Sequence, residues 1–167
     1  MGEATLFRDS GRSGYRGYVA SRPVRGTSFP QQVQNLVVRD YAARQGLLYL
    51  LSATEYAMPS CYLMMNAVLE ELPKLQGLIF FSIFMLPRRK ERRLDVFDRV
   101  LAAGCELHAA LENVVLRRRE DIAGLEDVLE VAFTLPRLPL AGRYEKDESS
   151  IHDRERDTFW SALASAL

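Results

Sequence analysis

The sequence predicts an α/β fold with a single doubly wound, mainly parallel sheet of four or five strands. Two observations predict it. Short, almost continuously apolar segments alternate four times with longer segments in which apolar residues recur every three or four positions. Continuously apolar strands are typical of a parallel sheet that helices cover on both faces. Right-handed connections then favour the strand order 2-1-3-4 for a chain of this length.

Each predicted element begins or ends at a residue of the expected kind. Pro30 suits the first turn of a helix, Ser60 can cap the next one, and Gly46 and Gly104 follow the ends of two helices. The predicted strands are 15–21, 47–54, 77–85 and 106–111, and the predicted helices are 30–45, 60–72, 89–103 and 120–133. The spacing assigns the inward faces of the first two helices to Val33, Leu36, Val37 and Tyr41, and to Leu63, Met64, Ala67, Val68 and Leu72.

The composition changes at both ends of this domain. Residues 1–14 contain Gly, Ser, Arg and Asp without a period, and we predict a mobile leader there, before the α/β domain of residues 15–134. Residues 135–167 begin with two prolines and a polar run, which predicts a tether. The apolar residues that follow it at helical spacing predict a short amphipathic C-terminal helix; they are Phe159, Trp160, Leu163 and Leu167.

Composition and charge exclude several classes of protein. With 48% apolar and 26% charged residues over 167 positions, the chain can close one globular core and is neither disordered nor collagen-like. Lys and Arg together number 22, as do Asp and Glu, so no overall field attracts nucleic acid or an anionic membrane. The longest apolar run, 78–86, has about half the length that spans a bilayer.

Two distant cysteines and the lack of a secretory leader favour a reduced, cytoplasmic protein. The sequence contains no P-loop, GxGxxG, HExxH or metal-spaced His/Cys cluster, so we predict neither a cofactor nor a metal. The amphipathic C-terminal helix can dock on the core or on a second subunit, and we expect a homo-oligomer.

The predicted strand order reverses between the first and third strands, and ligands of such sheets bind where the order reverses. Ser21 and Arg22 end the first strand on one side of this crevice, and residues 82–88 follow the third strand on the other. Ser21 is either a turn residue or a nucleophile. Arg22 is better suited to hold a phosphate or carboxylate, because its planar guanidinium binds such groups through two hydrogen bonds. The other side chains expected to bind substrate here are Tyr18, Gln34, Asn35, Ser82 and Asn113.

Residues 88–93 read Arg-Arg-Lys-Glu-Arg-Arg and place five cations at the start of the third helix. The first turn of a helix already attracts anions through its free backbone N–H groups and its dipole. We therefore predict that Arg88, Arg92 and Arg93 bind phosphate, with a solvated helix face as the alternative.

Two carboxylates also reach the predicted active edge. Glu55 follows the second strand and Glu112 follows the fourth. Either could act as a general base or stabilise an oxocarbenium ion, and either could instead pair with one of the arginines. Glu106 and His108 face the same side of their strand, which predicts a buried polar pair.

Several motifs are similar to those of the sporadic carbohydrate cluster protein family. They are GYVASRP at 17–23, PQxVQNLxxRDY at 30–41, SATEY at 52–56, FMLPxRxERR at 84–93 and ELH at 106–108. The likeness covers residues 15–129. It implies a place in the biosynthesis of surface glycans or glycosylated natural products.

A more distant resemblance connects the chain with the catalytic domain of serine recombinases and implies a resolvase/flavodoxin-like sheet. That fold opens with a Tyr-containing strand that ends in a nucleophilic Ser, and it carries an Arg-rich segment after its third strand. The resemblance implies that Ser21 is the nucleophile and Glu112 the carboxylate of the fourth strand. It implies phosphate-binding cations at Arg88, Arg92 or Arg93. Val19 stands where the recombinase pattern has an Arg.

Together these features predict an enzyme of carbohydrate or nucleoside-sugar biosynthesis that acts on a phosphorylated or nucleotide-linked sugar, by glycosyl transfer or hydrolysis. Its candidate catalytic residues are Ser21, Glu55 and Glu112. The alternatives are recombinase-like phosphodiester chemistry through Ser21 and a non-catalytic module that binds a sugar phosphate. The expected partner is a nucleotide sugar or a sugar phosphate, rather than nucleic acid or a membrane.

Overall fold

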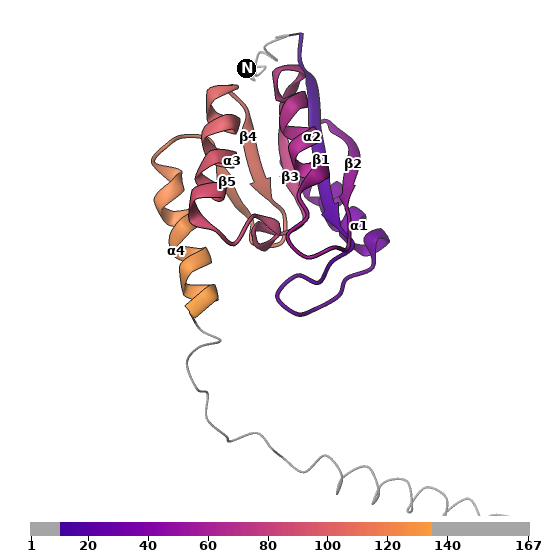
Figure 1. Cartoon of the computed structure of the whole chain (residues 1–167). Coiled ribbons are helices and arrows are strands. Elements are labelled where there is room, and N and C mark those ends of the chain that lie inside the picture. Colours follow the sequence, from indigo (N-terminus) through magenta and orange to yellow (C-terminus); the bar gives the residue numbers. More distant parts are fainter. Residues whose placement is uncertain (1–10, 135–167) are drawn as a thin grey trace, which may run out of the picture. The chain divides into compact units, whose positions relative to one another are not determined.

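A five-stranded sheet in the order β2-β1-β3-β4-β5 forms the centre of the computed structural model, which describes residues 11–134 (Figure 1). Its strands are β1 Ser13–Ala20, β2 Tyr49–Glu55, β3 Leu75–Phe80, β4 Glu106–Ala109 and β5 Val114–Leu116. The first four strands are parallel, and β5 returns antiparallel beside β4. The predicted doubly wound, mainly parallel α/β sheet is confirmed, with β5 as the fifth strand.

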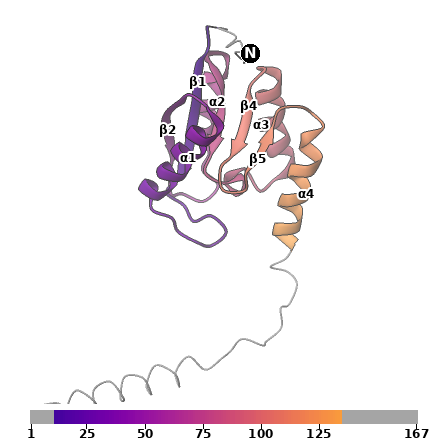
Figure 2. The same ribbon diagram turned by 180° about the vertical axis from the view of Figure 1, so that it is seen from behind.

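Four helices and two short 3-10 turns connect or follow the described strands. The helices are α1 Gln31–Gln45, α2 Leu63–Glu71, α3 Lys90–Ala102 and α4 Asp121–Thr134, and the turns are η1 Leu72–Lys74 and η2 Ile83–Met85. The chain runs from β1 to β2 in one direction and from β2 to β3 in the other. Right-handed crossovers therefore place α1 on one face of the sheet and α2 and α3 on the other. Accordingly, α2 and α3 lie in front of the sheet in Figure 1, and α1 lies in front of it in Figure 2.

The ends of two elements show how local residues position the chain. Gly46 adopts a φ of 66° and ends α1 in the left-handed region, as its place in the sequence predicts. β3 ends at Phe80, whereas the prediction extended it to residue 85. It ends early because Ser82 starts a new element, accepting a hydrogen bond from the backbone N–H of Phe84 and so capping η2.

The predicted terminal segments are described only in part. β1 begins at Ser13, two residues inside the predicted leader. Residues 1–10 of that leader lie outside the described part of the chain, as do the tether and C-terminal helix predicted for 135–167. Within residues 11–134, no helix combines the length and the apolar character needed to cross a bilayer.

Helices α1 and α2 bury faces that match only in part those that their apolar spacing predicts. The prediction is wrong for Leu36, which is 67% exposed, and for Leu63 at the start of α2, which is also exposed. The face of α1 is set by Gln34, whose buried amide bonds backbone groups of Ala20 and turns the neighbouring apolar positions outward. Tyr41, Val68 and Leu72 are buried as predicted, and the other buried residues are Gln34, Val38 and Ala42 of α1 and Met65 and Leu69 of α2.

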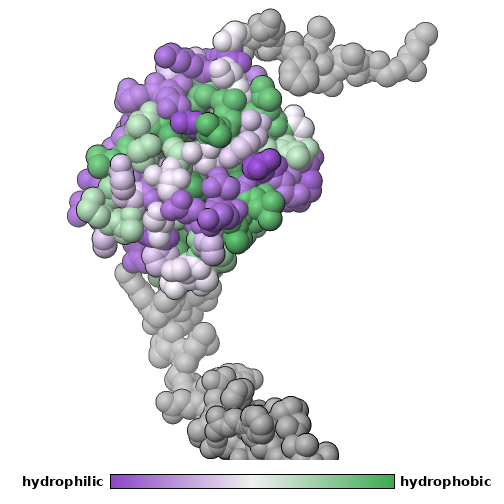
Figure 3. All heavy atoms as spheres, turned by 90° about the vertical axis from the view of Figure 1, so that its right-hand side faces the viewer, coloured by the Kyte–Doolittle hydropathy of each residue, from purple (hydrophilic) through white to green (hydrophobic). Residues whose placement is uncertain are grey.

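The sequence predicts that helices cover both faces of β2, but β2 is an edge strand. From the pair Tyr15–Tyr49 to the pair Gly17–Ser52, β1 advances two residues and β2 three, so β2 carries a bulge. Leu51 lies in this bulge and is 77% exposed. Figure 3 shows the side of the molecule where β2 lies, with apolar patches among polar ones. A bulged edge of this kind hinders pairing with further strands.

The core lies on both faces of the central strands β1 and β3. Their fully buried residues include Val19, Ala20, Leu78, Ile79 and Phe80. Burial of such side chains stabilises the fold by roughly 1.5–3 kcal/mol for each large one. The carboxyl ends of β1 and β3 are therefore held by the most tightly packed part of the domain.

Candidate functional site

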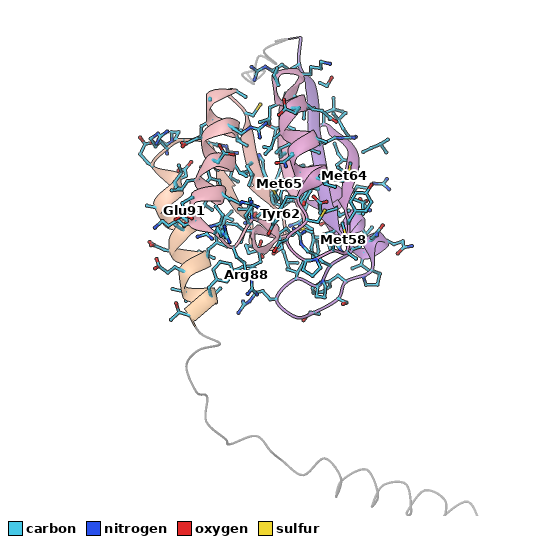
Figure 4. The ribbon with its side chains drawn as sticks, viewed as in Figure 1. Met58, Tyr62, Met64, Met65, Arg88 and Glu91 are labelled. Carbon is cyan, nitrogen blue, oxygen red and sulfur yellow. The ribbon has the colours of Figure 1, made fainter. Side chains whose placement is uncertain are left out.

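The carboxyl ends of β1 and β3 lie side by side, at the point where the strand order reverses. Loops 21–30, 56–62 and 81–89 leave the sheet at this edge, together with the turn 110–113 between β4 and β5. Figure 4 shows Met58 and Tyr62 at the start of α2, and Arg88 at the start of α3. We refer to these loops and the turn as the carboxyl edge.

Ser21 is exposed and directly follows β1. Its backbone N–H donates to the carbonyl of Glu55 at 3.1 Å and extends the pairing of β1 with β2. Its Oγ accepts a hydrogen bond from Nε2 of Gln31 at 2.7 Å, so the hydroxyl hydrogen is not used in this bond. The predicted nucleophile therefore stands at the carboxyl edge with its oxygen oriented by an amide.

Arg22 is half-buried and connects two loops of the carboxyl edge. Its Nη1 donates to the carbonyl of Cys61 at 2.5 Å and its Nη2 to the carbonyl of Met85 at 3.2 Å. Its guanidinium lies over the ring of Tyr62, 4.6 Å from the centroid. These contacts fix the guanidinium in place, and the two hydrogen bonds use two of its five N–H groups.

Arg25 also lies at this edge, and sequence reasoning missed it. Arg25 and Gly26 both have positive φ, 51° and 83°, and form a tight turn closed by the reciprocal backbone bonds of Val24 and Thr27. The turn places the Arg25 guanidinium over the ring of Phe84, at 4.9 Å. The Arg-Gly dipeptide was the available signal, because such turns favour a glycine in the second position.

Glu55 is completely buried, and both of its oxygens accept hydrogen bonds. One bond comes from the hydroxyl of Tyr18 at 3.0 Å, one comes from the thiol of Cys61 at 3.5 Å, and three come from the backbone N–H groups of Tyr56, Met64 and Met65. Burial alone would raise the pKa of this carboxyl, but the backbone N–H groups outweigh it and lower the pKa. Glu55 thus caps the start of α2 as an internal anion, and burial together with Glu55 raises the pKa of Tyr18.

Glu112 joins the end of β3 to the turn after β4. Its Oε1 accepts the hydroxyl hydrogen of the buried Ser82 at 2.6 Å, and its Oε2 accepts the backbone N–H of Ile83 at 2.9 Å. The neighbouring Asn113 has a φ of 53°, the left-handed conformation that asparagine tolerates in a tight turn. Ser82 and Asn113, which were both predicted to bind substrate, therefore lie at the carboxyl edge. The hydroxyl of Ser82 is used there in its hydrogen bond to Glu112.

Gln34 and Asn35 support the loop after β1 from the first turns of α1. The buried amide of Gln34 bonds the backbone N–H and carbonyl of Ala20 at 3.0 and 2.8 Å, and also the carbonyl of Phe29. Asn35 donates to the carbonyl of Gln31 within its own helix. Gln34 continues the hydrogen bonding of β1 beyond its end and so holds the chain just before Ser21.

The predicted cation cluster separates into an exposed group and one buried arginine. Arg93 is buried and makes a bidentate pair with Glu126 of α4, at 2.7 and 2.8 Å. It also donates to the carbonyls of Pro87 and Arg88. The guanidinium of Arg93 therefore holds the start of α3 to α4. The exposed cations at the start of α3 are Arg88, Arg89, Lys90 and Arg92.

A second polar network begins at the opposite end of β4 and contains the predicted pair of Glu106 and His108. Oε2 of Glu106 lies 2.9 Å from Nε2 of His108 and accepts the hydroxyl of Tyr15 at 3.1 Å. An ionised carboxylate only accepts, so Nε2 donates to Glu106, and Nδ1 shares a hydrogen bond of 3.0 Å with the hydroxyl of Tyr41, which it accepts when the imidazole is neutral. The pKa of Glu106 is lowered to about 2, chiefly by the bond from His108, with smaller contributions from Arg117 and Tyr15 that together outweigh the effect of burial.

The described residues contain no group of three or more His, Cys, Asp or Glu side chains arranged to hold a metal ion. The carboxylates at the carboxyl edge, Glu55 and Glu112, are instead bonded to N–H and O–H groups of the protein. The edge therefore offers an oriented hydroxyl and several exposed cations rather than a ligand set for a cation.

Comparison with known proteins finds a structural relative but no family. No family model matches the chain, and no curated protein matches it. The structure is similar to a resolvase family site-specific recombinase from Streptococcus pneumoniae, with a TM-score of 0.51 and 12% identity over 74% of this chain and 91% of that one. This likeness shows a resolvase-like fold. The N-terminal catalytic domain of TP901-1 integrase aligns with 13% identity and a TM-score of 0.44, over 75% of this chain and 99% of that one.

Proposed function

We propose that the carboxyl edge binds a phosphate ester and that the hydroxyl of Ser21 attacks its phosphorus, in the manner of recombinase-like phosphodiester chemistry. The observation that carries this proposal is the position of Ser21. It is exposed, directly follows the central strand β1, and has its oxygen oriented by Gln31. The resolvase-like fold supports the proposal, because the structural relative is described as a site-specific recombinase.

In the proposed step, a bond forms between Ser21 Oγ and phosphorus while the phosphorus–oxygen bond to the leaving alcohol breaks. The proton of the Ser21 hydroxyl passes to water, and the leaving oxygen takes up a proton from water. The amide of Gln31 donates to Oγ and so selects the orientation in which the remaining lone pair faces the substrate. The hydrogen bond therefore lowers the entropic cost of bringing Oγ into line with the phosphorus atom.

Cations supply the electrostatic part of the proposed mechanism. Arg22 is held by two backbone carbonyls and by Tyr62, so its charge is already in place before substrate binds. The exposed Arg89 and Arg92 flank the uncapped start of α3, where backbone N–H groups add to the positive potential. Negative charge that develops on the phosphoryl oxygens would be stabilised by these groups.

A second candidate is transfer or hydrolysis of a phosphorylated or nucleotide-linked sugar, the activity implied by the resemblance to the sporadic carbohydrate cluster family. The balance of charge favours it. With 22 basic and 22 acidic residues, the chain has no overall field that would attract a long polyanion such as DNA. A small phosphate ester needs only the local cations of the carboxyl edge.

The test is to incubate the full chain separately with bis(4-nitrophenyl) phosphate, supercoiled DNA and a panel of nucleotide sugars, and to measure the intact mass. The proposal predicts a covalent phosphoryl adduct that peptide mapping places on Ser21 and that Ser21→Ala removes. Ser28→Ala is the matched control, because Ser28 is an exposed serine of the same loop. Absence of an adduct with every substrate would overturn the proposal. Turnover of a nucleotide sugar without an adduct would favour the second candidate.

A further inference from the structure

We propose that Gln34 is a positioning residue for the hydroxyl of Ser21. Its buried amide takes the place that β3 would have beside the end of β1, and it thereby holds Ser21 at Gln31 of α1. The proposal rests on the proposed function, because the position of this hydroxyl matters to catalysis only if Ser21 reacts. It deepens that function by naming the residue that keeps the hydroxyl in place for the attack.

Hydrogen bonding between β1 and β3 stops before the end of β1. The N–H of Phe81 still donates to the carbonyl of Tyr18 at 3.1 Å. In a regular parallel pair, the carbonyl of Phe81 would next accept the N–H of Ala20. It accepts the N–H of Leu111 at 3.0 Å instead. Because β1 extends beyond β3 in this way, the N–H and the carbonyl of Ala20 need other partners on that side.

The side chain of Gln34 supplies both of these partners. Its Oε1 accepts the N–H of Ala20 at 3.0 Å, and its Nε2 donates to the carbonyl of Ala20 at 2.8 Å. The same Nε2 donates to the carbonyl of Phe29, also at 2.8 Å. One amide thus ties the end of β1 to the segment that leads into α1. Because Gln34 is completely buried, it acts on the site through these backbone groups and not by touching a substrate.

Gln34 and Gln31 hold two consecutive residues of the chain. They lie three positions apart in α1, so their side chains leave neighbouring points on one face of the helix. Gln34 bonds the backbone of Ala20, and Nε2 of Gln31 donates to Oγ of Ser21 at 2.7 Å. On the side of β2, the N–H of Ser21 donates to the carbonyl of Glu55 at 3.1 Å. The exposed hydroxyl of Ser21 therefore stands on a backbone that is bonded on both sides.

Loss of the Gln34 amide should release this end of β1. Leucine is similar in size but has no polar group, so the N–H and the carbonyl of Ala20 would turn towards other partners. Ser21 would then move relative to Gln31, and its hydroxyl would take up several orientations. Displacement of a reacting atom by about 1 Å can lower a rate by about 100-fold. The affinity for substrate should change little, because Gln34 contacts no substrate.

The test measures how fast Ser21 of the full chain is modified at increasing concentrations of bis(4-nitrophenyl) phosphate. Gln34→Leu should lower the maximal rate of adduct formation by about 10- to 100-fold and keep the half-saturating concentration within about twofold. Gln32→Leu is the matched control, because Gln32 is an exposed glutamine in the same turn of α1. Circular dichroism checks that each variant is folded at the temperature of the assay. An unchanged maximal rate in Gln34→Leu, or a change confined to half-saturation, would overturn the proposal.

NMR spectroscopy separates a positioning role from a merely stabilising one. Ser21→Ala should shift the side-chain amide resonance of Gln31, because the variant removes its acceptor. In Gln34→Leu, the same resonance should move towards its position in Ser21→Ala. If it keeps its wild-type position in the folded variant, Gln34 only stabilises the fold and the proposal is wrong. Gln34→Glu replaces Gln34→Leu if the latter does not fold. It keeps an acceptor for Ala20 but loses the NH2 group, so the same two changes are expected, and their absence would again overturn the proposal.

The two proposals fail in different ways. If the adduct forms at the same maximal rate in the wild type and in Gln34→Leu, the chemistry of Ser21 stands and the role given to Gln34 is wrong. If no ester modifies Ser21 but the Gln31 resonance moves in Gln34→Leu, Gln34 holds the hydroxyl as proposed and the proposed chemistry is wrong.

Discussion

The hydroxyl of Ser82 donates to Oε1 of Glu112 at 2.6 Å and joins the end of β3 to the turn that follows β4. The second oxygen of the same carboxylate accepts the N–H of Ile83, at the start of η2. A carboxylate held by two donors in this way orients the loop before α3 and with it the exposed cations of the carboxyl edge. Glu112 is thus a positioning residue in this arrangement.

We predict that Glu112→Gln lowers the free energy of unfolding by roughly 1–3 kcal/mol, because the charge is lost and the amide NH2 group then faces one of the two donors, the hydroxyl of Ser82 or the N–H of Ile83. Urea denaturation followed by circular dichroism measures this change. Glu120→Gln is the matched control, since Glu120 is exposed and should change stability by less than about 0.5 kcal/mol. Equal stability of both variants would contradict the role given to Glu112.

The buried pair of Arg93 and Glu126 should be among the most sensitive contacts of the domain. Their side chains are only 5% and 10% exposed, so removal of one partner leaves the other charge buried. Arg93→Met is expected to cost about 3–5 kcal/mol. The control is Arg99→Met, because Glu70, the partner of Arg99, is 78% exposed and such pairs contribute about 0–1 kcal/mol. A smaller loss for Arg93→Met than for Arg99→Met would be the contrary result.

Glu106 should make stability depend on pH in the acid range. Its pKa is lowered from 4.5 to about 2 in the folded chain, chiefly by the bond from His108. The stabilising contribution is therefore complete above pH 4.5 and is lost as the pH falls towards 2. We expect roughly 1–2 kcal/mol, because the carboxylate is partly exposed and solvent screens it. The free energy of unfolding, measured from pH 6 to about pH 2, should fall less steeply in Glu106→Gln than in the wild type.

Gly77 lies where β3 passes closest to its neighbours. A Cβ there would stand 2.4 Å from the carbonyl oxygen of Glu106 and 2.7 Å from the ring of Tyr15. Gly77→Ala should therefore destabilise the fold by about 1–3 kcal/mol. Gly124→Ala, in α4, meets no atom within 4 Å and should instead stabilise by up to about 1 kcal/mol. Thermal denaturation of the two variants checks the opposite signs.

The alternation of elements could be read from the sequence because it depends on neighbours in the chain. Gly46 ends α1 through its own φ, and the strand order 2-1-3-4 is the commonest of the few that right-handed crossovers allow for a chain of this length. The position of Ser21 and Arg22 after the first strand follows in the same way. These predictions needed no knowledge of distant contacts.

The faces of the helices could not be read in this way. Apolar spacing favoured Val33 and Leu36 as the inward positions of α1, but the helix turns Gln34 inward because the backbone of Ala20 needs hydrogen-bond partners at the end of β1. The position of the fifth strand could not be predicted either. The strand has only three residues, too few for a recognisable pattern, and its pairing with β4 holds it in the sheet.

By itself, the sequence predicted the order of the four parallel strands and placed a serine, an arginine and a cation cluster at one edge of the sheet. Only the tertiary structure decided what each polar group there does. It set Glu55 as an internal cap of α2, joined Glu112 to Ser82, and buried Arg93 against Glu126, while Ser21 stayed exposed. The physical reason is that charge and hydrogen-bonding capacity belong to a residue, whereas its partner is supplied by a loop far away in the chain.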